Sequence, residues 1–296
     1  MKTLPSAWLR SPETRSFLDR ALREDIGRGD ITSRLTIPAR ARASAVLIAK
    51  EKGVAAGLPL FAEVFKRVDR RVNVKLLKHD AQALGAGMQV ARLEGPTRAL
   101  LAGERLALNF LQQLSGVASF TARYVAEARR GGKAAVLDTR KTVPGLRLLQ
   151  KYAVVCGGGL NHRLRLDDAV LIKDNHVKAA GSVTAAIAAC RRGAPRLSVE
   201  CEVETLDELA EALQAGAHIV LLDNFSLPLL KLAVSRLKVF NRGRRRPVLS
   251  EASGRVTLKT LRAIAATGVD RISVGALTHS APALDFSLEF LDPARV

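Results

Sequence analysis

Charged side chains and glycines follow a series of apolar runs between residues 136 and 277, and their types suit the chemistry of anions. Arg140 and Lys141 follow the first run, Lys173 follows the second, and Glu202 and Asp223 follow the next two. Buried parallel strands are continuous Val, Ile and Leu runs, and a βα barrel carries its catalytic residues at the ends of such strands. The pattern therefore predicts an enzyme whose active site lies at one rim of a barrel.

The neighbouring cations Arg140 and Lys141 suit the binding of a carboxylate or phosphate, Arg through its planar fork and Lys as a point charge. Pro144-Gly145 lies just beyond them and prevents the strand from continuing. The structural alternative is an ion pair with Asp138 or Asp174. Anion binding is the interpretation we prefer.

A glycine run, residues 157–159, leads to His162 and Arg163. Glycines let backbone amides approach an anion, but the same run is also typical of a helix end. His162 beside Arg163 has two interpretations as well, a cation paired with an anionic ligand or a structural histidine. Both questions stay open at the level of the sequence.

Glu202 and Asp223, placed among many cations, are candidates to hold Mg²⁺ or ribose hydroxyls, because magnesium prefers one or two carboxylates together with phosphate oxygens. Their alternative role is to neutralise neighbouring Lys and Arg. Ser253-Gly254 and Gly275-Ala276 lie on the last two loops, where barrels commonly bind phosphate through backbone N–H groups. We therefore expect a phosphate site there rather than plain turns.

The elements that must position these residues fall into two groups, and the first, up to about residue 116, mixes helices with strands. We expect helices around 17–22 and 59–68, a turn-rich link at 24–32, and strands at 43–49, 72–77 and 88–93. A long helical region, 99–130, bridges the two groups, and we expect Ser115-Gly116 to interrupt it. Together these elements predict a small sheet packed by helices.

From about residue 134 onward, strands alternate with helices at 183–190, 206–214, 228–239 and 258–266. Thr205 and Glu208 have the spacing of a capping box, and Gly193, Gly216 and Gly268 each follow a helix. About six strands can be assigned, so the barrel is incomplete or recruits one more strand. The alternating segment 282–290 predicts a strand that returns to the first domain's sheet.

Length and composition bound these interpretations. The 296 residues exceed the ~200–250 of a single barrel, and 48% hydrophobic residues with a mean hydropathy of +0.08 predict a core without a membrane span. Residues 1–15 do not read as a secretory signal, and three cysteines without metal-ligand spacing suit a reducing cytoplasm, where we expect the protein.

The net charge of +19 predicts an anionic ligand. A nucleic-acid-binding protein on an enzyme fold is one alternative, but only 4% of residues are aromatic, and single-stranded platforms need stacking aromatics. The basic run 242–246 is interpreted as a solvated loop. Small phosphorylated or dicarboxylate substrates explain the cations of a cleft, and we expect no membrane partner.

Ordered motifs over nearly the whole chain resemble the quinolinate phosphoribosyltransferase family. They are ALREDIG (21–27), GDIT (29–32), ERLALNFLQ (104–112), DTRKT (138–142), CGGGLNHR (156–163), LIKDNH (171–176), ECEVE (200–204), LDN (222–224), EASG (251–254) and VGALTH (274–279). The resemblance implies an α/β protein, with an N-terminal α/β sandwich over 1–116 joined by 282–296, and an open (β/α) barrel over 117–281.

The resemblance also implies the reaction. Members transfer ribose 5-phosphate from phosphoribosyl pyrophosphate to quinolinate with loss of CO₂, giving nicotinate mononucleotide and pyrophosphate for NAD synthesis. It implies Mg²⁺ as cofactor and a homodimer with shared active sites, with higher oligomers left open. The alternatives are a relative in the molybdenum-transport-associated branch with another acceptor and the nucleic-acid-binding protein above.

Residue by residue, the resemblance gives Arg105 contact with quinolinate from the partner subunit. Substrate binding extends to Thr139. The cationic pocket would consist of Arg140, His162, Arg163 and Lys173. Lys141 would face the phosphoribosyl donor, Glu202 and Asp223 its ribose or the Mg²⁺, and Ser253, Gly254, Gly275 and Ala276 its 5-phosphate.

Two positions depart from the family pattern. Arg255 stands where a second Gly is usual after Ser253-Gly254, and Arg165 stands where a Gly often follows the His-Arg pair. Arg255 would either crowd the phosphate loop or add a phosphate contact, and the sequence leaves both open.

Overall fold

The computed structural model describes residues 11–291, which form two compact units. The first unit holds the chain up to Phe120 together with Pro144–Gly158 and the C-terminal segment from Ala281, and the second holds Thr121–Val143 and Gly159–Ser280. Residues 1–10 and 292–296, which the sequence assigns to the sandwich domain, lie outside the described residues. The domain boundary at residues 116 and 117 stays a prediction.

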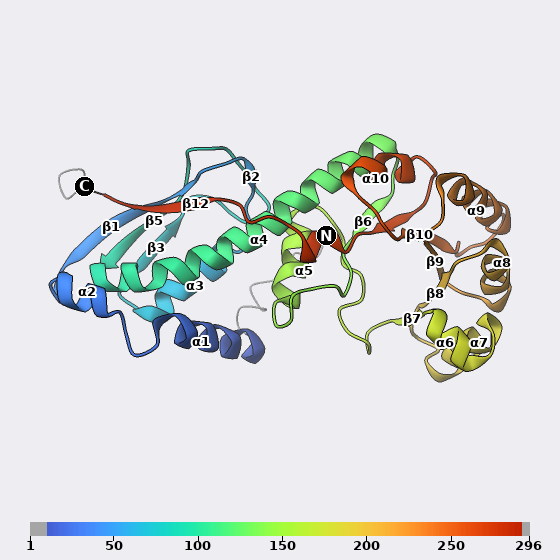
Figure 1. Cartoon of the computed structure of the whole chain (residues 1–296), viewed down its shortest axis with the longest axis horizontal. Coiled ribbons are helices and arrows are strands. Elements are labelled where there is room, and N and C mark those ends of the chain that lie inside the picture. The colour runs from blue at the N-terminus through green and yellow to red at the C-terminus, as the bar shows by residue number, and fades with distance from the viewer. Residues whose placement is uncertain (1–10, 292–296) are drawn as a thin grey trace. The chain divides into compact units, whose positions relative to one another are not determined.

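An antiparallel sheet forms the centre of the first unit, with strand order β12-β1-β5-β3. Its strands are β1 (Arg42–Ala49), β3 (Asn73–Leu76), β5 (Met88–Pro96) and β12 (Phe286–Phe290), and a small second sheet pairs β2 (Gly53–Val54) with β4 (Ala83–Leu84). Leu47 of β1 pairs with Leu288 of β12 and with Ala91 of β5. The predicted return of the C-terminal strand to this sheet is therefore confirmed (Figure 1).

The first unit also contains the helices α1 (Pro12–Ile26), α2 (Ile31–Thr36), α3 (Leu58–Val68) and α5 (Arg147–Cys156). α3 buries an apolar face in which Phe61 and Phe65 meet edge to face, with ring centroids 5.1 Å apart. The predicted link at 24–32 is shorter than expected, because Asp30 caps α2 by accepting a hydrogen bond from Ser33 N at 3.0 Å.

The long helix α4 (Thr97–Gly131) runs without interruption through Ser115-Gly116, so the predicted break there is wrong. Ser115 Oγ accepts a hydrogen bond from Ala56 N at 3.0 Å, and a Cβ on Gly116 would lie 2.1 Å from Pro282 O. The two small residues let neighbouring segments approach the helix closely. Close packing, and not helix termination, explains them.

The second unit is built on a parallel sheet with strand order β6-β11-β10-β9-β8-β7. The strands are β6 (Ala135–Leu137), β7 (Val170–Ile172), β8 (Val199–Val203), β9 (Ile219–Asp223), β10 (Leu249–Ser253) and β11 (Arg271–Ser273). Every neighbouring pair is parallel, and β6 and β7 are the two ends of the sheet in the described chain. The predicted α/β class with an open barrel is confirmed.

Helices connect these strands: α6 (Asp174–Ala180), α7 (Val183–Gly193), α8 (Leu206–Ala215), α9 (Leu227–Phe240), α10 (Leu258–Ala265) and α11 (Ala276–His279) (Figure 1). The predicted capping box is present, because Thr205 Oγ1 accepts from Glu208 N at 3.1 Å and Glu208 Oε2 accepts from Thr205 N at 3.2 Å. Gly216 ends α8 with a left-handed φ of 89°, whereas Gly193 is still inside α7.

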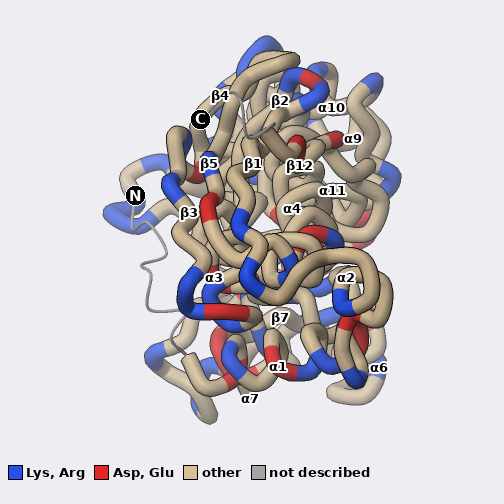
Figure 2. Tube along the Cα trace, turned by 90° about the vertical axis from the view of Figure 1, so that its left-hand side faces the viewer, with Lys and Arg blue, Asp and Glu red and all other residues tan. Residues whose placement is uncertain are grey.

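Charged residues are distributed over most of the elements. Lys and Arg occur along many separate elements and alternate with Asp and Glu (Figure 2). Among the described residues, no helix combines the length and apolar character that a bilayer span needs.

Candidate active site

The alternation of side chains along the parallel strands decides which residues share a face. Glu202, Leu221 and Glu251 are neighbours in register on β8, β9 and β10, so their side chains point to the same side of the sheet. Residues 199, 201 and 203 of β8 are buried on the opposite side. The face that carries Glu202 is the one that opens into a pocket.

This pocket has a volume of about 600 Å³ and is formed entirely by the second unit. That volume lies within the ~300–1,000 Å³ typical of small-molecule sites. Ten of the thirteen predicted site residues line it: Thr139, Arg140, Lys141, His162, Arg163, Lys173, Glu202, Asp223, Ser253 and Gly254. Leu171, Leu221, Asn224, Arg255 and Ser273 complete the lining.

Arg140 and Arg163 bring two guanidinium groups to the pocket, and the described residues leave the Nε of each without a hydrogen-bond partner. Both Nε atoms are buried. Burial lowers the pKa of Arg163 from its usual value, and the charge of Arg140 lowers it further. Two buried donors that repel one another are suited to bind an anion between them.

The alternative ion pairs that the sequence left open are not formed by these cations. Asp138 accepts hydrogen bonds from Asn161 Nδ2 at 2.6 Å and from His162 N at 2.9 Å, and Asp174 pairs with Lys178 at 3.2 Å. Among the described carboxylates, none forms a salt bridge with Arg140 or Lys141.

Lys173 and the two carboxylates lie along one part of the rim. Lys173 precedes α6, and its Nζ lies 3.0 Å from Glu202 Oε2. Asp223 ends β9, where its Oδ2 accepts a hydrogen bond from Asn224 Nδ2 at 2.6 Å. Both carboxylates line the pocket, so either can contact a ligand hydroxyl or a cation bound there.

The loop after β10 is shaped by left-handed backbone. Gly254 has φ +93°, and a Cβ there would lie 2.2 Å from Asn224 Oδ1, so only glycine fits. Asn224 has φ +55° and Arg255 has φ +49°. Arg255 therefore occupies a conformation in which glycine is favoured, and its exposed side chain lines the pocket.

Gly275 and Ala276 do not line the pocket but contact a residue that does. A Cβ on Gly275 would lie 3.0 Å from Lys141 Cδ, and Thr278 Oγ1 donates a hydrogen bond to Lys141 O at 2.7 Å. The start of α11 thus packs against the Lys141 segment. Its phosphate role stays a prediction.

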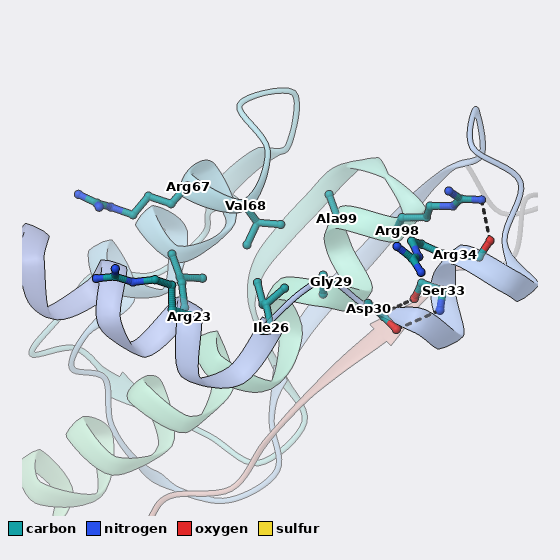
Figure 3. A pocket seen from close by; sticks show the side chains of 13 residues that line it. Arg23, Ile26, Gly29, Asp30, Ser33, Arg34, Arg67, Val68, Arg98 and Ala99 are labelled. Carbon is teal, nitrogen blue, oxygen red and sulfur yellow. Dashed lines mark hydrogen bonds between the residues drawn. The ribbon is translucent and has the colours of Figure 1, made fainter.

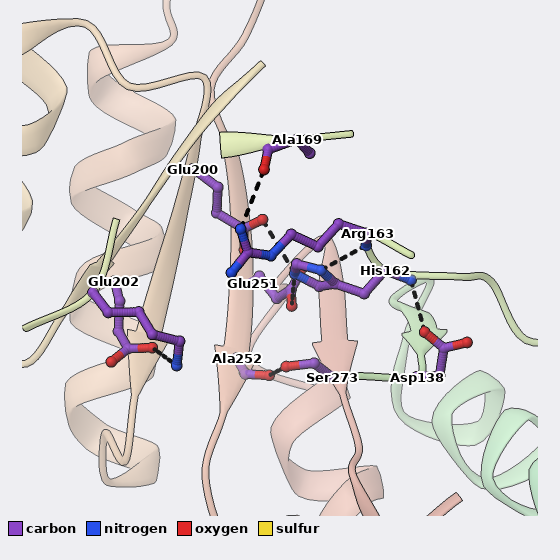
Figure 4. Close-up of polar contacts among 10 residues, drawn as sticks. Asp138, His162, Arg163, Ala169, Glu200, Glu202, Glu251, Ala252 and Ser273 are labelled. Carbon is purple, nitrogen blue, oxygen red and sulfur yellow. Dashed lines mark hydrogen bonds and ion pairs between the residues drawn. The ribbon is translucent and has the colours of Figure 1, made fainter. Parts of the chain in front are cut away.

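His162 contacts two buried acids that the sequence reasoning did not select. His162 Nε2 lies 3.2 Å from Glu200 Oε2 and 3.5 Å from Glu251 Oε1 (Figure 4). Burial first, and then the charge of Glu200, raises the pKa of Glu251 to about 7. The alternation of side chains along a strand could have identified these acids, because Glu200 lies two residues before Glu202 and Glu251 two residues before Ser253, on the same face of their strands.

The glycine run ends α5 in the first unit, where Gly157 N donates a hydrogen bond to Ala153 O at 3.0 Å. The helix-end interpretation thus describes Gly157.

Arg105 is exposed on α4 and belongs to the first unit as well. Its predicted contact with quinolinate across a dimer stays a prediction.

A second hollow, of about 440 Å³, lies in the first unit beside α1 and α2 (Figure 3). Several of its arginines are engaged by the protein. Arg98 Nε donates to Ile37 O at 2.9 Å, Arg67 Nε pairs with Glu63 at 3.0 Å, and Arg23 Nε donates to Asp19 O at 3.1 Å. The chemistry therefore concentrates in the pocket of the second unit.

Comparisons with known proteins agree along almost the entire chain. The family model described as "Quinolinate phosphoribosyl transferase, N-terminal domain" matches residues 30–115, and the one for the C-terminal domain matches residues 117–289. A "Probable nicotinate-nucleotide pyrophosphorylase [carboxylating]" from Synechocystis sp. is 43% identical over 93% of this chain and 92% of its own length. The corresponding Mycobacterium leprae protein is also 43% identical, over 93% of this chain and 96% of its own.

Solved structures give the same result. The nicotinate-nucleotide pyrophosphorylase from Francisella tularensis superposes with a TM-score of 0.89 at 41% identity, covering 95% of this chain and 98% of that one. The Pyrococcus furiosus nicotinate-nucleotide pyrophosphorylase, at 18% identity and a TM-score of 0.64, shares the fold over 93% of this chain and 74% of its own.

Proposed function

The chain belongs to the quinolinate phosphoribosyltransferase family, and from this premise we propose that the pocket of the second unit is its active site. The reaction is transfer of ribose 5-phosphate from phosphoribosyl pyrophosphate to quinolinate, with release of pyrophosphate and CO₂. The product, nicotinate mononucleotide, belongs to NAD biosynthesis. The main support for assigning the active site to this pocket is that the Nε groups of Arg140 and Arg163 are buried and have no hydrogen-bond partner among the described residues.

The acceptor is a pyridine dicarboxylate, and the cations of the pocket suit it. Arg140 and Arg163 can each bind a carboxylate through a guanidinium fork, and Lys173 adds a point charge at the same rim. Fixed cations in a half-buried pocket attract a dianion more strongly than cations in water do. We assign the two arginines to the carboxylate that the product retains.

The transfer step needs no protein nucleophile, because the pyridine nitrogen itself attacks the anomeric carbon. The C–O bond to pyrophosphate breaks through an oxocarbenium-like state, and negative charge grows on the leaving group. Lys141 is placed to stabilise that charge. Backbone N–H groups of Ser253 and Gly254 are assigned to the donor's 5-phosphate.

Mg²⁺ fits the donor set of this pocket. Glu202 and Asp223 both line it, and magnesium is usually held by one or two carboxylates plus substrate phosphate oxygens. When bound, the ion would neutralise charge on the leaving pyrophosphate. Glu202 also binds Lys173 at 3.0 Å, which leaves its second oxygen for the ion or a ribose hydroxyl.

Decarboxylation follows from the charge that the transfer creates. The ribosylated nitrogen is positive, so it stabilises the electron pair that stays on the adjacent ring carbon when the C–C bond to CO₂ breaks. That carbon then takes up a proton. Arg140 and Arg163 hold the ring by its remaining carboxylate while CO₂ leaves.

We also propose a homodimer in which the partner subunit's Arg105 completes each pocket, and a cytoplasmic location. Arg105 is exposed on α4, as such a contact requires. The three cysteines are free thiols, and burial raises the pKa values of Cys156 and Cys201 to about 12, which suits a reducing compartment.

One assay tests the acceptor. The purified chain is incubated with phosphoribosyl pyrophosphate, Mg²⁺ and either quinolinate or nicotinate, and the mononucleotide and CO₂ are measured. Quinolinate should give both products, and nicotinate should give neither. Turnover of nicotinate but not quinolinate would reject the assigned acceptor.

A further inference from the structure

The trio of His162, Glu200 and Glu251 beneath the pocket is not used by the steps above. Its members come from the segment before β7, from β8 and from β10, and their ligand atoms lie within 4.8 Å of one another. The side chains of Glu200 and Glu251 are 7% and 0% exposed. Apart from the contact of Glu251 Oε1 with His162 Nε2 (Figure 4), Oε1 of Glu200 and both side-chain oxygens of Glu251 have no hydrogen-bond partner among the described residues.

The protonation of His162 follows from its hydrogen bonds. Arg163 N donates to His162 Nδ1 at 2.8 Å, so Nδ1 is an acceptor and carries no proton. The proton of the neutral ring must then lie on Nε2, which faces Glu200 at 3.2 Å. His162 is therefore held as the neutral Nε2–H tautomer.

This tautomer also argues against a metal ion in the trio. A metal bound to Nε2 of a neutral imidazole requires the proton on Nδ1. The N–H of Arg163 occupies the Nδ1 lone pair and opposes that form. The trio is therefore suited to bind a proton and not a metal ion.

The remaining charges identify where that proton lies. Nε2 of His162 lies closer to Glu200 than to Glu251, at 3.2 Å against 3.5 Å, and Glu251 is the more deeply buried of the two acids. Two buried carboxylates this close do not both ionise easily. His162, the hydroxyl of Ser273 and, least, Arg271, which is in register with Glu251 on β11, lower the pKa of Glu251 and partly oppose this effect. The neighbour of Glu251 on β9 is the apolar Leu221.

The trio is also electrically coupled to the pocket above it. Glu200 acts on the guanidinium of Arg163, whose pKa its negative charge raises against the effects of burial and Arg140. His162 and Arg163 both line the pocket. Negative charge that a ligand brings to these residues therefore repels the carboxylates below them and favours their protonated form.

We propose that Glu251 is a charge-balancing residue that takes up a proton from solvent when the dianionic acceptor binds. Two negative charges arriving above Arg140 and Arg163 make an ionised Glu251 less favourable, so the buried carboxylate is neutralised as the pocket fills. The identity of the ligand rests on the proposed function. The proton uptake itself rests on the geometry of the trio.

The test is calorimetric titration of the wild-type enzyme with quinolinate, without the phosphoribosyl donor, in two buffers of different ionisation enthalpy at pH 7–8. Because burial and the charge of Glu200 raise the pKa of Glu251 towards neutrality, binding should take up a fraction of a proton that is larger at pH 8 than at pH 7. Quinolinate affinity should fall by up to about tenfold per pH unit above 7. Uptake near zero in the wild type would overturn the proposal.

Glu251→Gln tests the residue, because its amide imitates the protonated acid in shape and charge. This variant should bind quinolinate with little proton uptake and with affinity that is nearly independent of pH. The matched control is Glu204→Gln, an exposed position just beyond β8, which should keep the wild-type uptake. Equal uptake in Glu251→Gln and wild type would assign the proton to another group.

Thermal melts distinguish a folding defect from a lost proton site. The folded pKa of Glu251, about 7, is above the ordinary glutamate pKa of 4.5, so the native state binds more protons than the unfolded state between these values. Wild-type stability should therefore fall as pH rises from 4.5 through 7, and Glu251→Gln should lack this part of the slope. If the variant does not fold, the wild-type titration alone decides.

The two proposals fail in different ways. Absence of nicotinate mononucleotide in the turnover assay would reject the proposed function. Normal turnover together with binding that exchanges no protons would reject only the role of Glu251.

Discussion

At the scale of single residues, two arginines of the pocket each keep one buried donor that no described residue satisfies. The guanidinium Nε groups of Arg140 and Arg163 are buried yet make no hydrogen bond among the described residues. A buried donor without an acceptor costs free energy in the empty protein. Binding of a carboxylate removes that cost, so the pocket is organised for an anion before one arrives.

Arg140→Ala should remove most of the activity and leave the fold intact. A hydrogen bond to a charged group contributes about 1.5–3 kcal/mol, so kcat/KM should fall roughly 10- to 100-fold or more. Steady-state kinetics with quinolinate give the number. Arg165→Ala is the control, because Arg165 is exposed and outside the pocket lining. Wild-type turnover by Arg140→Ala would mean that the pocket is assigned wrongly.

Arg255 combines backbone strain with a place in the pocket. Its φ of +49° is left-handed, which costs a residue with a side chain about 1 kcal/mol relative to glycine. The exposed guanidinium lines the pocket next to the loop assigned to phosphate. A retained strain of this kind is explained if the side chain contributes to binding.

Arg255→Gly should therefore make the protein more stable by about 0.5–1 kcal/mol in urea unfolding, because the left-handed strain disappears. It should also raise the KM for phosphoribosyl pyrophosphate, because the pocket loses a cation. A stabilised variant with an unchanged KM would show that Arg255 makes no phosphate contact and only occupies the loop.

At the scale of elements, two periodicities position the chemistry. Along β8 and β10 the period of two places Glu200 below Glu202 and Glu251 below Ser253, on the pocket face. Along α4 the helical period continues through Ser115 and Gly116, since both are held by close packing in the first unit. The small residues of that helix allow neighbouring segments to pack closely against it.

Gly116→Ala should destabilise the protein although alanine is the better helix former. The new Cβ would lie 2.1 Å from Pro282 O and 2.9 Å from Ala283 Cα, so backbone must move, at a cost of roughly 1–3 kcal/mol. Thermal unfolding should show a lower Tm.

Gly193→Ala is the matched control for that substitution. Gly193 is also helical and has open space around its Cβ position, so alanine there should be neutral or stabilising. If both variants behaved alike, helix propensity rather than close packing would govern position 116.

At the scale of the whole molecule, the pocket and Arg105 belong to different units. All pocket-lining residues lie in the second unit, and Arg105 lies in the first. The net charge of +19 is spread over many elements (Figure 2), so it favours anionic ligands in general without marking a nucleic-acid track. In the proposed homodimer, Arg105 of the partner subunit would complete each pocket.

Mixed dimers test that sharing. Arg105→Ala and Lys173→Ala should each be nearly inactive alone, because each removes one cation from every site. A mixed dimer carries both changes in one pocket and none in the other, so it should regain up to about half of the wild-type activity per dimer. Verified mixed dimers without any recovered activity would argue that Arg105 does not act across the interface.

The sequence by itself determined the alternation of the longer strands and helices and the rim where charges collect, but not short elements such as α2 and β2. Some patterns can be recognised in the sequence alone because they are local. They include apolar periodicity, caps such as Thr205 with Glu208, and cations just past strand ends. The family motifs also lie within short segments, so the reaction was readable from them.

Only the tertiary structure decided how distant residues affect one another. Only the tertiary structure shows Pro282 O lying where a Cβ on residue 116 would be, and only it brings Glu200 and Glu251 from two strands to Nε2 of His162. The left-handed φ of Arg255 is set by its loop and not by its side chain. Such features arise from contacts between segments far apart in the chain, and no pattern within one segment encodes them.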